Sequence, residues 1–163
     1  LEGDRAGVLA RAEAAGVGLM VTISTRIAQF DRIRAIIEDN EQVYGSVGTH
    51  PHNADEEDGI DAETLVRLAE HPKIVALGEC GLDYHYDSGS PAAQARGFRA
   101  HIAATRETGL PVVIHARDAD DDVIRILEEE TGRGPFPALL HVLLVVEIPT
   151  VRRNSEVVPN IVR

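Results

Sequence analysis

The sequence predicts an α/β protein built on a parallel sheet, and two observations lead to that prediction. Segments in which apolar residues recur with helical spacing alternate along the chain with short apolar or β-branched runs. These runs are nearly continuous in apolar residues, and each is followed by a helix of about three turns, which is typical of buried parallel strands. Such a sheet is either doubly wound or closed into a barrel.

The elements follow one another in a regular order. Helices are predicted at 5–15, 28–39, 61–71, 91–108 and 118–131, and strands at 17–24, 43–50, 73–79, 110–116 and 136–142. Ser90 followed by Pro91 is typical of a capped helix start, and Gly109 with Pro111 is typical of a helix end. The repeating unit is therefore a strand followed by a helix.

Length, charge and cysteine content limit the kind of protein this is. The 163 residues correspond to one domain, 1–163. A net charge of −11 argues against a scaffold that holds nucleic acid by bulk electrostatics, but not against an enzyme that meets phosphate through divalent cations. A single cysteine excludes an internal disulfide, and no run approaches the ~18 apolar residues of a membrane helix. We therefore expect a cytoplasmic protein with no membrane contact.

Polar side chains with metal-binding chemistry come at or just after the predicted strands. Glu79 follows "VALG", His115 follows "PVVI" and His141 follows "PALL". The carboxyl ends of parallel strands form the edge where ligands bind, so we expect these side chains to lie together. Imidazole nitrogens and carboxylate oxygens are donors for divalent cations. Each residue alone is equally compatible with a hydrogen-bonded core or rim position.

Two further histidines flank Pro51 directly after the predicted strand "SVGT". His50 and His52 could bind a phosphate, move a proton or simply cap the loop. The motifs "GxSxG", "GxxxxGK" and "GxGxxG" are absent, which disfavours serine hydrolases, P-loop enzymes and dinucleotide oxidoreductases.

The remaining reactive residues have simpler interpretations. Cys80 is expected to be a packing residue because no helix start follows it to lower its pKa. His71 is expected at a helix end, and His85 and His101 at the surface. The acidic stretches 53–63 and 118–122 are expected to be solvated loop and helix N-terminal charge, with Asp118 in the first turn of a helix.

Four segments together resemble a known family. "VGTHPH", "ALGECGLDY", "GLPVVIHARDA" and "ALLH" resemble, in order and spacing, signature segments of the TatD-related metal-dependent deoxyribonucleases. That family belongs to the amidohydrolase-like superfamily and has a distorted TIM barrel. The resemblance runs from about residue 5 to residue 141 and implies a (β/α)8 barrel of the metal-dependent hydrolase type, with some barrel elements absent from this chain.

The resemblance implies a role for individual residues. Glu79 matches the glutamate that bridges two metals, His115 and His141 match metal-binding histidines, and His50 matches the histidine near the scissile phosphate. Glu79 and His50 are thus the implied catalytic residues. The positions implied to orient the substrate or the metal ligands are His52, Asp83, Arg117 and Asp118.

The chain also departs from the family pattern. The family's first strand carries "D-x-H-x-H", which supplies two more ligands, whereas this chain begins without methionine in what looks like the first helix. Near the end, "LLVVE" resembles a further strand and Glu147 and Arg153–Asn154 are recognisable, but the metal-binding aspartate has no counterpart. Because a complete barrel needs ~250 residues, we expect the chain to join ordered segments of a longer protein whose other segments are absent, rather than to be a deleted relative.

The resemblance implies a hydrolase of phosphodiester bonds that uses divalent metal ions, two in number, whether Mg, Mn or Zn. The expected activity is that of a 3'-5' exodeoxyribonuclease on single-stranded DNA or DNA ends, with no obligate protein partner. One alternative is a metal hydrolase of the same superfamily that acts on another ester or amide. A second alternative is a metal-poor, non-catalytic domain, which the missing "H-x-H" and aspartate favour.

Overall fold

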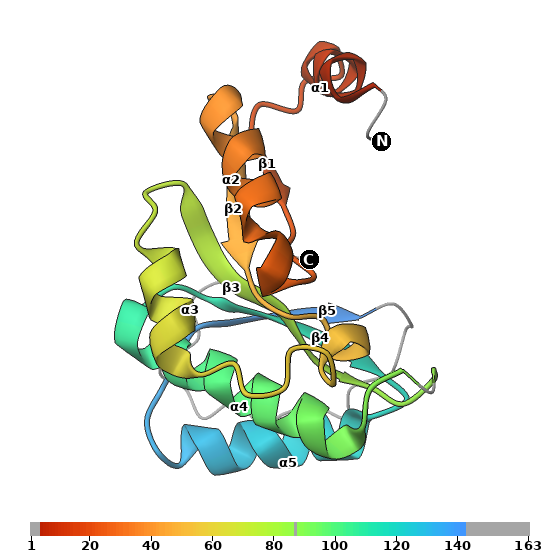
Figure 1. Ribbon diagram of the computed structural model, residues 1–163, viewed down its shortest axis with the longest axis vertical. Coiled ribbons are helices and arrows are strands. Elements are labelled where there is room, and N and C mark those ends of the chain that lie inside the picture. Colours follow the sequence, from red (N-terminus) through yellow and green to blue (C-terminus); the bar gives the residue numbers. More distant parts are fainter. Residues whose placement is uncertain (1–3, 87, 143–163) are drawn as a thin grey trace.

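A computed structural model describes residues 4–86 and 88–142 and contains a five-stranded parallel sheet in the order β1-β2-β3-β4-β5 (Figure 1). The strands are β1 Met20–Thr22, β2 Val43–Val47, β3 Ile74–Asp83, β4 Val112–Arg117 and β5 Ala138–Val142. The helices are α1 Arg5–Ala14, α2 Phe30–Asp39, α3 Ala62–Ala69, α4 Pro91–Thr108 and α5 Asp120–Thr131, with short 3-10 helices η1 Ile27–Gln29 and η2 Pro51–Asn53.

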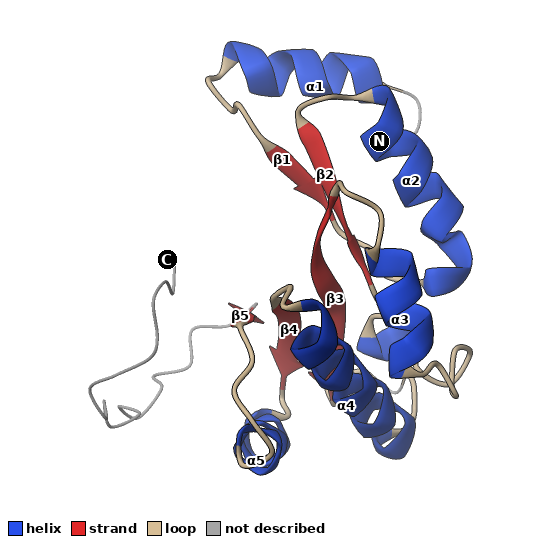
Figure 2. Ribbon diagram, turned by 90° about the vertical axis from the view of Figure 1, so that its left-hand side faces the viewer, coloured by secondary structure: helices blue, strands red, loops and turns tan. Residues whose placement is uncertain are grey.

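The strand order decides between the two sheet types that the sequence leaves open. Every strand pairs with its neighbours in the chain, so the order has no reversal. Figure 2 shows α2, α3 and α4 along one face of the curved sheet. A doubly wound sheet reverses its strand order and carries helices on both faces, whereas a barrel keeps one order and places its helices outside. The described chain is therefore a parallel half-barrel.

Helix α4 links the two parts of the hydrophobic core. One cluster joins β3 and β4 to α4 and α5 and includes Leu82, Phe98, Ile114 and Ile126. The other joins β2 and β3 to α2, α3 and α4, and Ala104 of α4 belongs to it. Both ends of α4 follow the prediction, because the Ser90 side chain accepts the Ala93 N–H and Gly109 is left-handed with φ 73°. The long central helix thus holds β3 against both of its neighbours.

Strand β3 is longer than predicted, and this changes the position of Glu79. The strand continues from Ile74 to Asp83, with a shift of register against β4 between Leu77 and Cys80. Glu79 therefore lies at an irregularity inside the strand and not at its end, and the Gly78–Glu79 peptide bond is cis.

Two glycines on either side of Glu79 allow β3 to continue past it. Gly78 and Gly81 have φ of 124° and 129°. A Cβ atom would lie 2.5 Å from the Val113 carbonyl oxygen at Gly78 and 2.2 Å from the His115 carbonyl oxygen at Gly81. Here glycine permits a close approach of two strand backbones, not a turn.

Other boundaries also differ from the prediction. The first strand covers Met20–Thr22 of the predicted 17–24, and α5 begins at Asp120. Asp118 precedes that helix with φ 51°, so its predicted place in the first helical turn is wrong. The predicted strand at 143–147, Glu147 and Arg153–Asn154 lie outside the described residues.

The acidic stretch 53–63 is mostly engaged in contacts and is not simply solvated. Asp61 caps α3, as expected of helix N-terminal charge, by accepting the Thr64 N–H. Glu57 accepts the backbone N–H groups of Ile27 and Ala28 at 3.0 and 2.8 Å and the Thr49 hydroxyl. Further contacts from this stretch are Asp55 with Ser90, Asp58 with Arg96 and Glu56 with Arg26. These carboxylates tie the loop after β2 to α4 and to the segment after β1.

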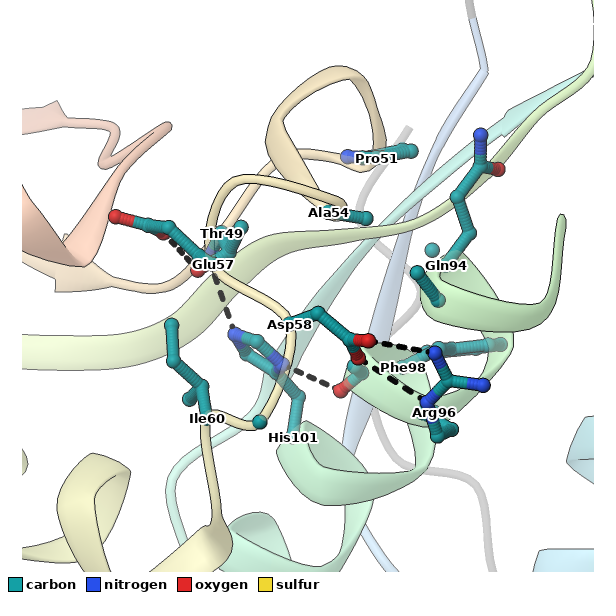
Figure 3. A pocket seen from close by; sticks show the side chains of 14 residues that line it. Thr49, Pro51, Ala54, Glu57, Asp58, Ile60, Gln94, Arg96, Phe98 and His101 are labelled. Atoms are coloured by element: carbon teal, nitrogen blue, oxygen red, sulfur yellow. Dashed lines mark hydrogen bonds and ion pairs between the residues drawn. The ribbon is translucent and has the colours of Figure 1, made fainter. Parts of the chain in front are cut away.

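His101 is fully buried, so its predicted surface position is wrong. It follows Phe98 by three residues and precedes Ile102, which places it on the core side of α4. The ring donates from Nδ1 to the Gly97 carbonyl at 2.7 Å and accepts the Thr49 N–H at Nε2 over 3.2 Å (Figure 3). A cavity of about 130 Å³ lies beside it, between the loop after β2 and α4. Burial lowers the pKa of His101 to about 4.

No helix in the described part of the chain combines the length and the apolar character that crossing a membrane requires.

Candidate metal centre

Three neighbouring strands bring the predicted metal ligands together. In the sheet register, His115 of β4 pairs with Gly81 of β3 on one side and with His141 of β5 on the other. Glu79 reaches into this row, and its Oε1 atom lies 3.2 Å from His115 Nδ1 and 2.8 Å from His141 Nδ1. Glu79 and His115 are buried, while the His141 side chain is 56% exposed. One carboxylate oxygen thus faces two imidazole nitrogens from two other strands.

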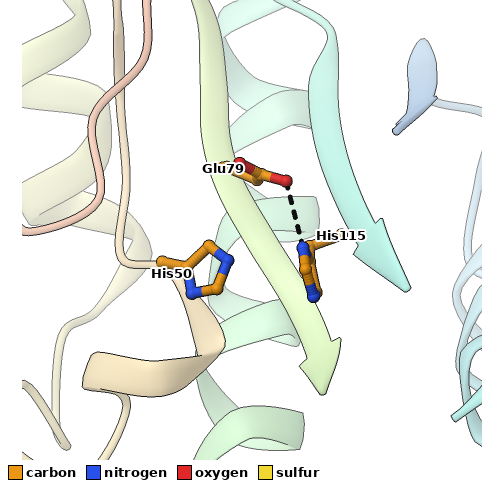
Figure 4. A group of neighbouring side chains, drawn as sticks. All are labelled: His50, Glu79 and His115. Atoms are coloured by element: carbon orange, nitrogen blue, oxygen red, sulfur yellow. Dashed lines mark hydrogen bonds and ion pairs between the residues drawn. The ribbon is translucent and has the colours of Figure 1, made fainter. Parts of the chain in front are cut away.

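His50 joins this group from the turn after β2. Its backbone N–H donates to the Thr25 carbonyl, and its Nδ1 accepts the His52 N–H at the start of η2. His50, Glu79 and His115 each offer a ligand atom within 4.8 Å of the others (Figure 4). His50 therefore caps its loop, which is one of the roles considered from the sequence, and also lies close to Glu79 and His115.

Asp83 orients two of the imidazoles. Its side chain is fully buried, and Oδ2 lies 2.9 Å from His115 Nε2 and 2.7 Å from His52 Nε2. An ionised carboxylate only accepts hydrogen bonds, so both histidines must present an Nε2–H to Asp83. Neutral His115 then has its free lone pair on Nδ1, which is the atom that faces Glu79.

The backbone of Asp83 is held by a glutamine from α4. Gln94 Oε1 accepts the Asp83 N–H at 2.9 Å, and Gln94 Nε2 donates to the Asp83 carbonyl at 3.1 Å. Gln94 is itself buried. The orientation of His115 therefore depends on a chain of contacts that reaches from the sheet to the helix layer.

The pKa values follow from burial and from these contacts. Burial raises the pKa of Glu79, but the hydrogen bonds from His115 and His141 outweigh it and hold the pKa at about 2. Burial also raises the pKa of Asp83, but its bonds to His52 and His115 outweigh burial and lower the pKa overall. Burial and the neighbouring His115 lower the pKa of His50 to about 4. Near neutral pH, therefore, both carboxylates are charged and His50 is neutral.

The donor set fits a divalent cation. If His115 is neutral with its proton on Nε2, its Nδ1 lone pair faces the carboxylate of Glu79 over 3.2 Å, and two acceptors at that distance need either a proton or a cation between or beside them. Burial opposes protonation of His115, but its bonds to Glu79 and Asp83 outweigh burial and raise its pKa overall, so a divalent cation at Nδ1 would take the place of the second ring proton. Imidazole nitrogen with carboxylate oxygen suits Zn or Mn, and a carboxylate suits Mg.

The last two predicted site residues, Arg117 and Asp118, lie at the edge of the candidate metal centre. Arg117 follows His115 by two residues in β4, and its guanidinium carbon stands 4.7 Å from the centre of the Tyr86 ring. Asp118 is exposed, and its Oδ2 lies 2.7 Å from Nδ1 of His85, which is exposed as predicted. Both residues thus contact the segment that follows β3 and not the buried ligands.

Two serines that the sequence analysis did not single out hold the backbone at Glu79. Ser46 Oγ donates to the Gly78 carbonyl at 2.6 Å and accepts the Ser24 N–H at 2.9 Å. The Ser24 carbonyl accepts the N–H of Glu79 at 3.0 Å. The available signal was a small polar residue inside each apolar run, in "VTIS" and "YGSVG". Gln94 and Tyr86 were missed as well.

Cys80 is a packing residue, as predicted. It is buried in the core cluster of β3, β4, α4 and α5, and burial raises the pKa of its thiol well above the usual value. His71 lies just after α3 and contacts Glu38 and the Lys73 N–H, away from the buried ligands.

Comparison with known proteins identifies the family. The model of the family "TatD related DNase" matches residues 1–144. An uncharacterized metal-dependent hydrolase, YabD of Bacillus subtilis, is 38% identical over 138 residues, which are 85% of this chain and 54% of YabD. The 3'-5' ssDNA/RNA exonuclease TatD of Erwinia tasmaniensis is 39% identical over 126 residues, 77% of this chain and 49% of that protein. The chain thus spans about half the length of the curated relatives it matches.

Solved structures agree with the half-barrel. YJJV, a TatD homologue from Escherichia coli K12, superposes with a TM-score of 0.71 at 29% identity, covering 78% of this chain and 50% of that one. A TatD family hydrolase from Entamoeba histolytica gives a TM-score of 0.71 at 26% identity, covering 82% and 48%. The motifs, the fold and the family match agree, and the chain belongs to the TatD-related DNase family.

Proposed function

We propose that the protein is a divalent-metal-dependent phosphodiesterase that removes nucleotides from the 3' end of single-stranded DNA. The observation that carries the proposal is the contact chain from Asp83 through His115 to Glu79, which holds a ring nitrogen of His115 3.2 Å from a carboxylate oxygen of Glu79, with a ligand atom of His50 within 4.8 Å of both residues. The similarity to a relative named as a 3'-5' ssDNA/RNA exonuclease supports the choice of substrate. Residues 1–163 are taken as part of one barrel domain, because α4 packs in both core clusters.

In this proposal each residue has a defined task. Glu79, His115 and His141 would hold the divalent metal ions, which we propose to be two in number; one oxygen of Glu79 lies 3.2 Å from Nδ1 of His115 and 2.8 Å from Nδ1 of His141. Divalent cations bound there would stabilise negative charge on a phosphate and lower the pKa of a bound water. His50 is neutral near pH 7 and its Nδ1 accepts the His52 N–H, so its Nε2 carries the proton and can donate a hydrogen bond to a phosphate oxygen.

The remaining contacts orient these groups. Asp83 keeps the Nε2 proton on His115 and leaves Nδ1 free for a cation. Asp83 also contacts Nε2 of His52 at 2.7 Å and so positions His52, which lies in the same turn as His50. Because Glu79 is held by backbone contacts to Ser24 and Ser46, the carboxylate is positioned before any substrate arrives.

The test is a cleavage assay with the protein expressed from its complete gene. A single-stranded oligonucleotide labelled at its 5' end is incubated with Mg, Mn or Zn over a titration. We expect a ladder of 5'-labelled products shortened stepwise from the 3' end, and loss of this ladder on chelation. Glu79→Ala and His115→Ala should each reduce the rate by more than about 100-fold, since metal ligands and the residues that orient them have effects of that size or larger.

Two control variants distinguish the site from the rest of the acidic surface. Glu63→Ala and His71→Ala change the same residue types outside the site and should leave the rate within about twofold. If the wild-type protein cleaves no oligonucleotide at any metal concentration, or hydrolyses only small esters, the nuclease proposal is wrong. A parallel RNA substrate shows whether the activity is confined to DNA.

A further inference from the structure

Tyr86 is the exposed aromatic side chain nearest the candidate metal centre in the described part of the chain. Its ring is 50% exposed, and it belongs to neither core cluster. Tyr84, two residues earlier, behaves differently: it packs against the core and its hydroxyl donates to Asp122 at 2.8 Å. Core packing therefore explains Tyr84 but leaves Tyr86 unexplained.

Tyr86 is tied to the metal centre through Asp83. The Oδ1 atom of Asp83 accepts the backbone N–H groups of His85 at 3.0 Å and Tyr86 at 3.4 Å, while its Oδ2 atom faces His52 and His115. One buried carboxylate thus positions both the imidazoles and the turn that presents the tyrosine. The ring also meets His52 edge to face, with the ring centres 5.4 Å apart. The tyrosine is fixed next to the site.

Arg117 stands against the same ring. Its guanidinium carbon lies 4.7 Å from the ring centre, which is a cation–π contact. Its Nε is buried without a hydrogen-bond partner, and no ion pair among residues 4–86 and 88–142 includes Arg117. In a chain with 27 acidic and 16 basic residues, an arginine without a carboxylate partner beside a metal centre has its charge available to an anion.

We propose that Tyr86 and Arg117 form a nucleotide-binding subsite, in which the exposed part of the Tyr86 ring stacks on a base and Arg117 contacts a backbone phosphate of the same strand. The inference rests on the proposed nuclease function and adds the residues that recognise the nucleotide. An aromatic ring stacks on any base, and an arginine placed against it supplies charge to the backbone. The subsite would therefore favour single strands, whose bases are unpaired, without selecting a sequence.

The experiment detects stacking directly. Phosphorothioate single strands that resist cleavage carry 2-aminopurine at one of the three positions nearest the 3' end, and each is titrated with protein in the presence of Mn. Because stacking quenches 2-aminopurine fluorescence, we expect wild-type protein to quench at one position. Tyr86→Phe should retain the quench. Tyr86→Leu should lose it and bind roughly 5- to 100-fold more weakly, which corresponds to the loss of one base–aromatic stack.

An abasic strand separates stacking from a merely structural role of Tyr86. With the base removed at the quenched position, wild type and Tyr86→Leu should bind with equal affinity. Equal weakening of Tyr86→Leu on the base-containing and abasic strands would overturn the inference. Tyr84→Phe is the matched control and should bind both strands like wild type. Unfolding temperature and metal content of Tyr86→Leu, compared with wild type, show whether the fold is kept.

The phosphate contact proposed for Arg117 is tested separately, through the salt dependence of binding. For Arg117→Met, the slope of log binding constant against log salt concentration should fall by about 0.7, the value for one phosphate contact on a single strand. An unchanged slope would overturn the phosphate contact.

The failure of this inference differs from failure of the proposed function. If wild type cleaves DNA but no quench depends on Tyr86, the subsite is wrong and the nuclease proposal stands. If the quench depends on Tyr86 but no cleavage occurs, the subsite stands and the nuclease proposal is wrong. If neither is observed, both are wrong.

Discussion

At the scale of single residues, the site depends on buried polar groups whose hydrogen bonds are fully used. Ser46 is the clearest case, because it is fully buried between β1 and β3 and contacts the backbone on both sides. Its hydroxyl accepts from Ser24 and donates to Gly78, the residue before Glu79. Removing a hydroxyl of this kind leaves a buried N–H and a buried carbonyl without a partner.

We expect Ser46→Ala to lower the free energy of unfolding by about 1–3 kcal/mol, because two backbone groups lose their partner in a site that water cannot readily reach. Chemical denaturation measures the change. Ser46→Thr is a poor control because of its extra methyl group, so the comparison is Ser88→Ala, whose hydroxyl has no hydrogen-bond partner among the described residues. If Ser46→Ala costs no more than Ser88→Ala, the hydroxyl does not secure this part of the sheet.

At the scale of elements, α4 does more than cover the sheet. Gln94 holds Asp83, and His101 accepts the N–H of Thr49, the residue before His50. At its other end, α4 meets α5 through Glu130, a buried carboxylate that pairs with Arg99, Arg106 and Arg133. Because one helix contacts the turn of His50, the end of β3 and the next helix, a change in α4 reaches the site without touching a ligand.

His101 makes stability depend on pH. Its pKa falls from 6.5 in the unfolded chain to about 4 in the folded protein because of burial, with Glu57 and the Gly97 carbonyl opposing the shift. Between those values the unfolded chain binds a proton that the folded protein does not, so acidification favours unfolding. We expect His101 to account for a loss of about 2–3 kcal/mol between pH 7.5 and pH 4.5.

The measurement is urea denaturation at both pH values for wild type and His101→Gln, which retains an acceptor for Thr49 but does not titrate. The loss of stability on acidification should be smaller in the variant by that amount. His71→Gln, at a partly exposed histidine, is the control and should follow wild type. Parallel losses in wild type and His101→Gln would show that His101 is not the titrating group.

At the scale of the whole molecule, the site combines strands and a turn that are far apart in the sequence. His50 and His141 are 91 positions apart, yet both meet Glu79 or its neighbours because consecutive parallel strands present equivalent positions at one edge. The buried carboxylates sit in a chain with a net charge of −11. At the proposed site a divalent cation would relieve this repulsion and connect β3, β4 and β5, so binding should stabilise the whole fold.

We expect Mn or Zn to raise the unfolding temperature, with a stabilisation of about 2.7 kcal/mol when the free metal is at about 100 times its dissociation constant. Glu79→Gln should lose most of this effect. Glu63→Gln makes the same change of charge at an exposed position and should keep it, which separates specific binding from general screening. Equal metal stabilisation of the two variants in differential scanning calorimetry would place the binding elsewhere.

Much of the element pattern could be predicted because it depends on neighbours in the chain. Apolar spacing located the five helices and the five strands of the described residues to within three residues at each end, except for the carboxyl end of β3. Ser90, Pro91 and Gly109 marked the ends of α4 because capping is a local interaction. The carboxyl end of β3 was not predicted, since the sequence does not show whether a glycine ends a strand or lets two strands approach closely.

The sequence by itself determined the alternation of strands and helices, the family and the chemical types of the candidate ligands, because these follow from residue order and composition. Only the tertiary structure decided that Asp83 sets the proton position on His115, that two serines and Gln94 hold the ligand strand, that His101 is buried, and that Tyr86 faces solvent beside Arg117. These features depend on contacts between residues distant in the chain, and such contacts arise only when the sheet register and the helix packing are set.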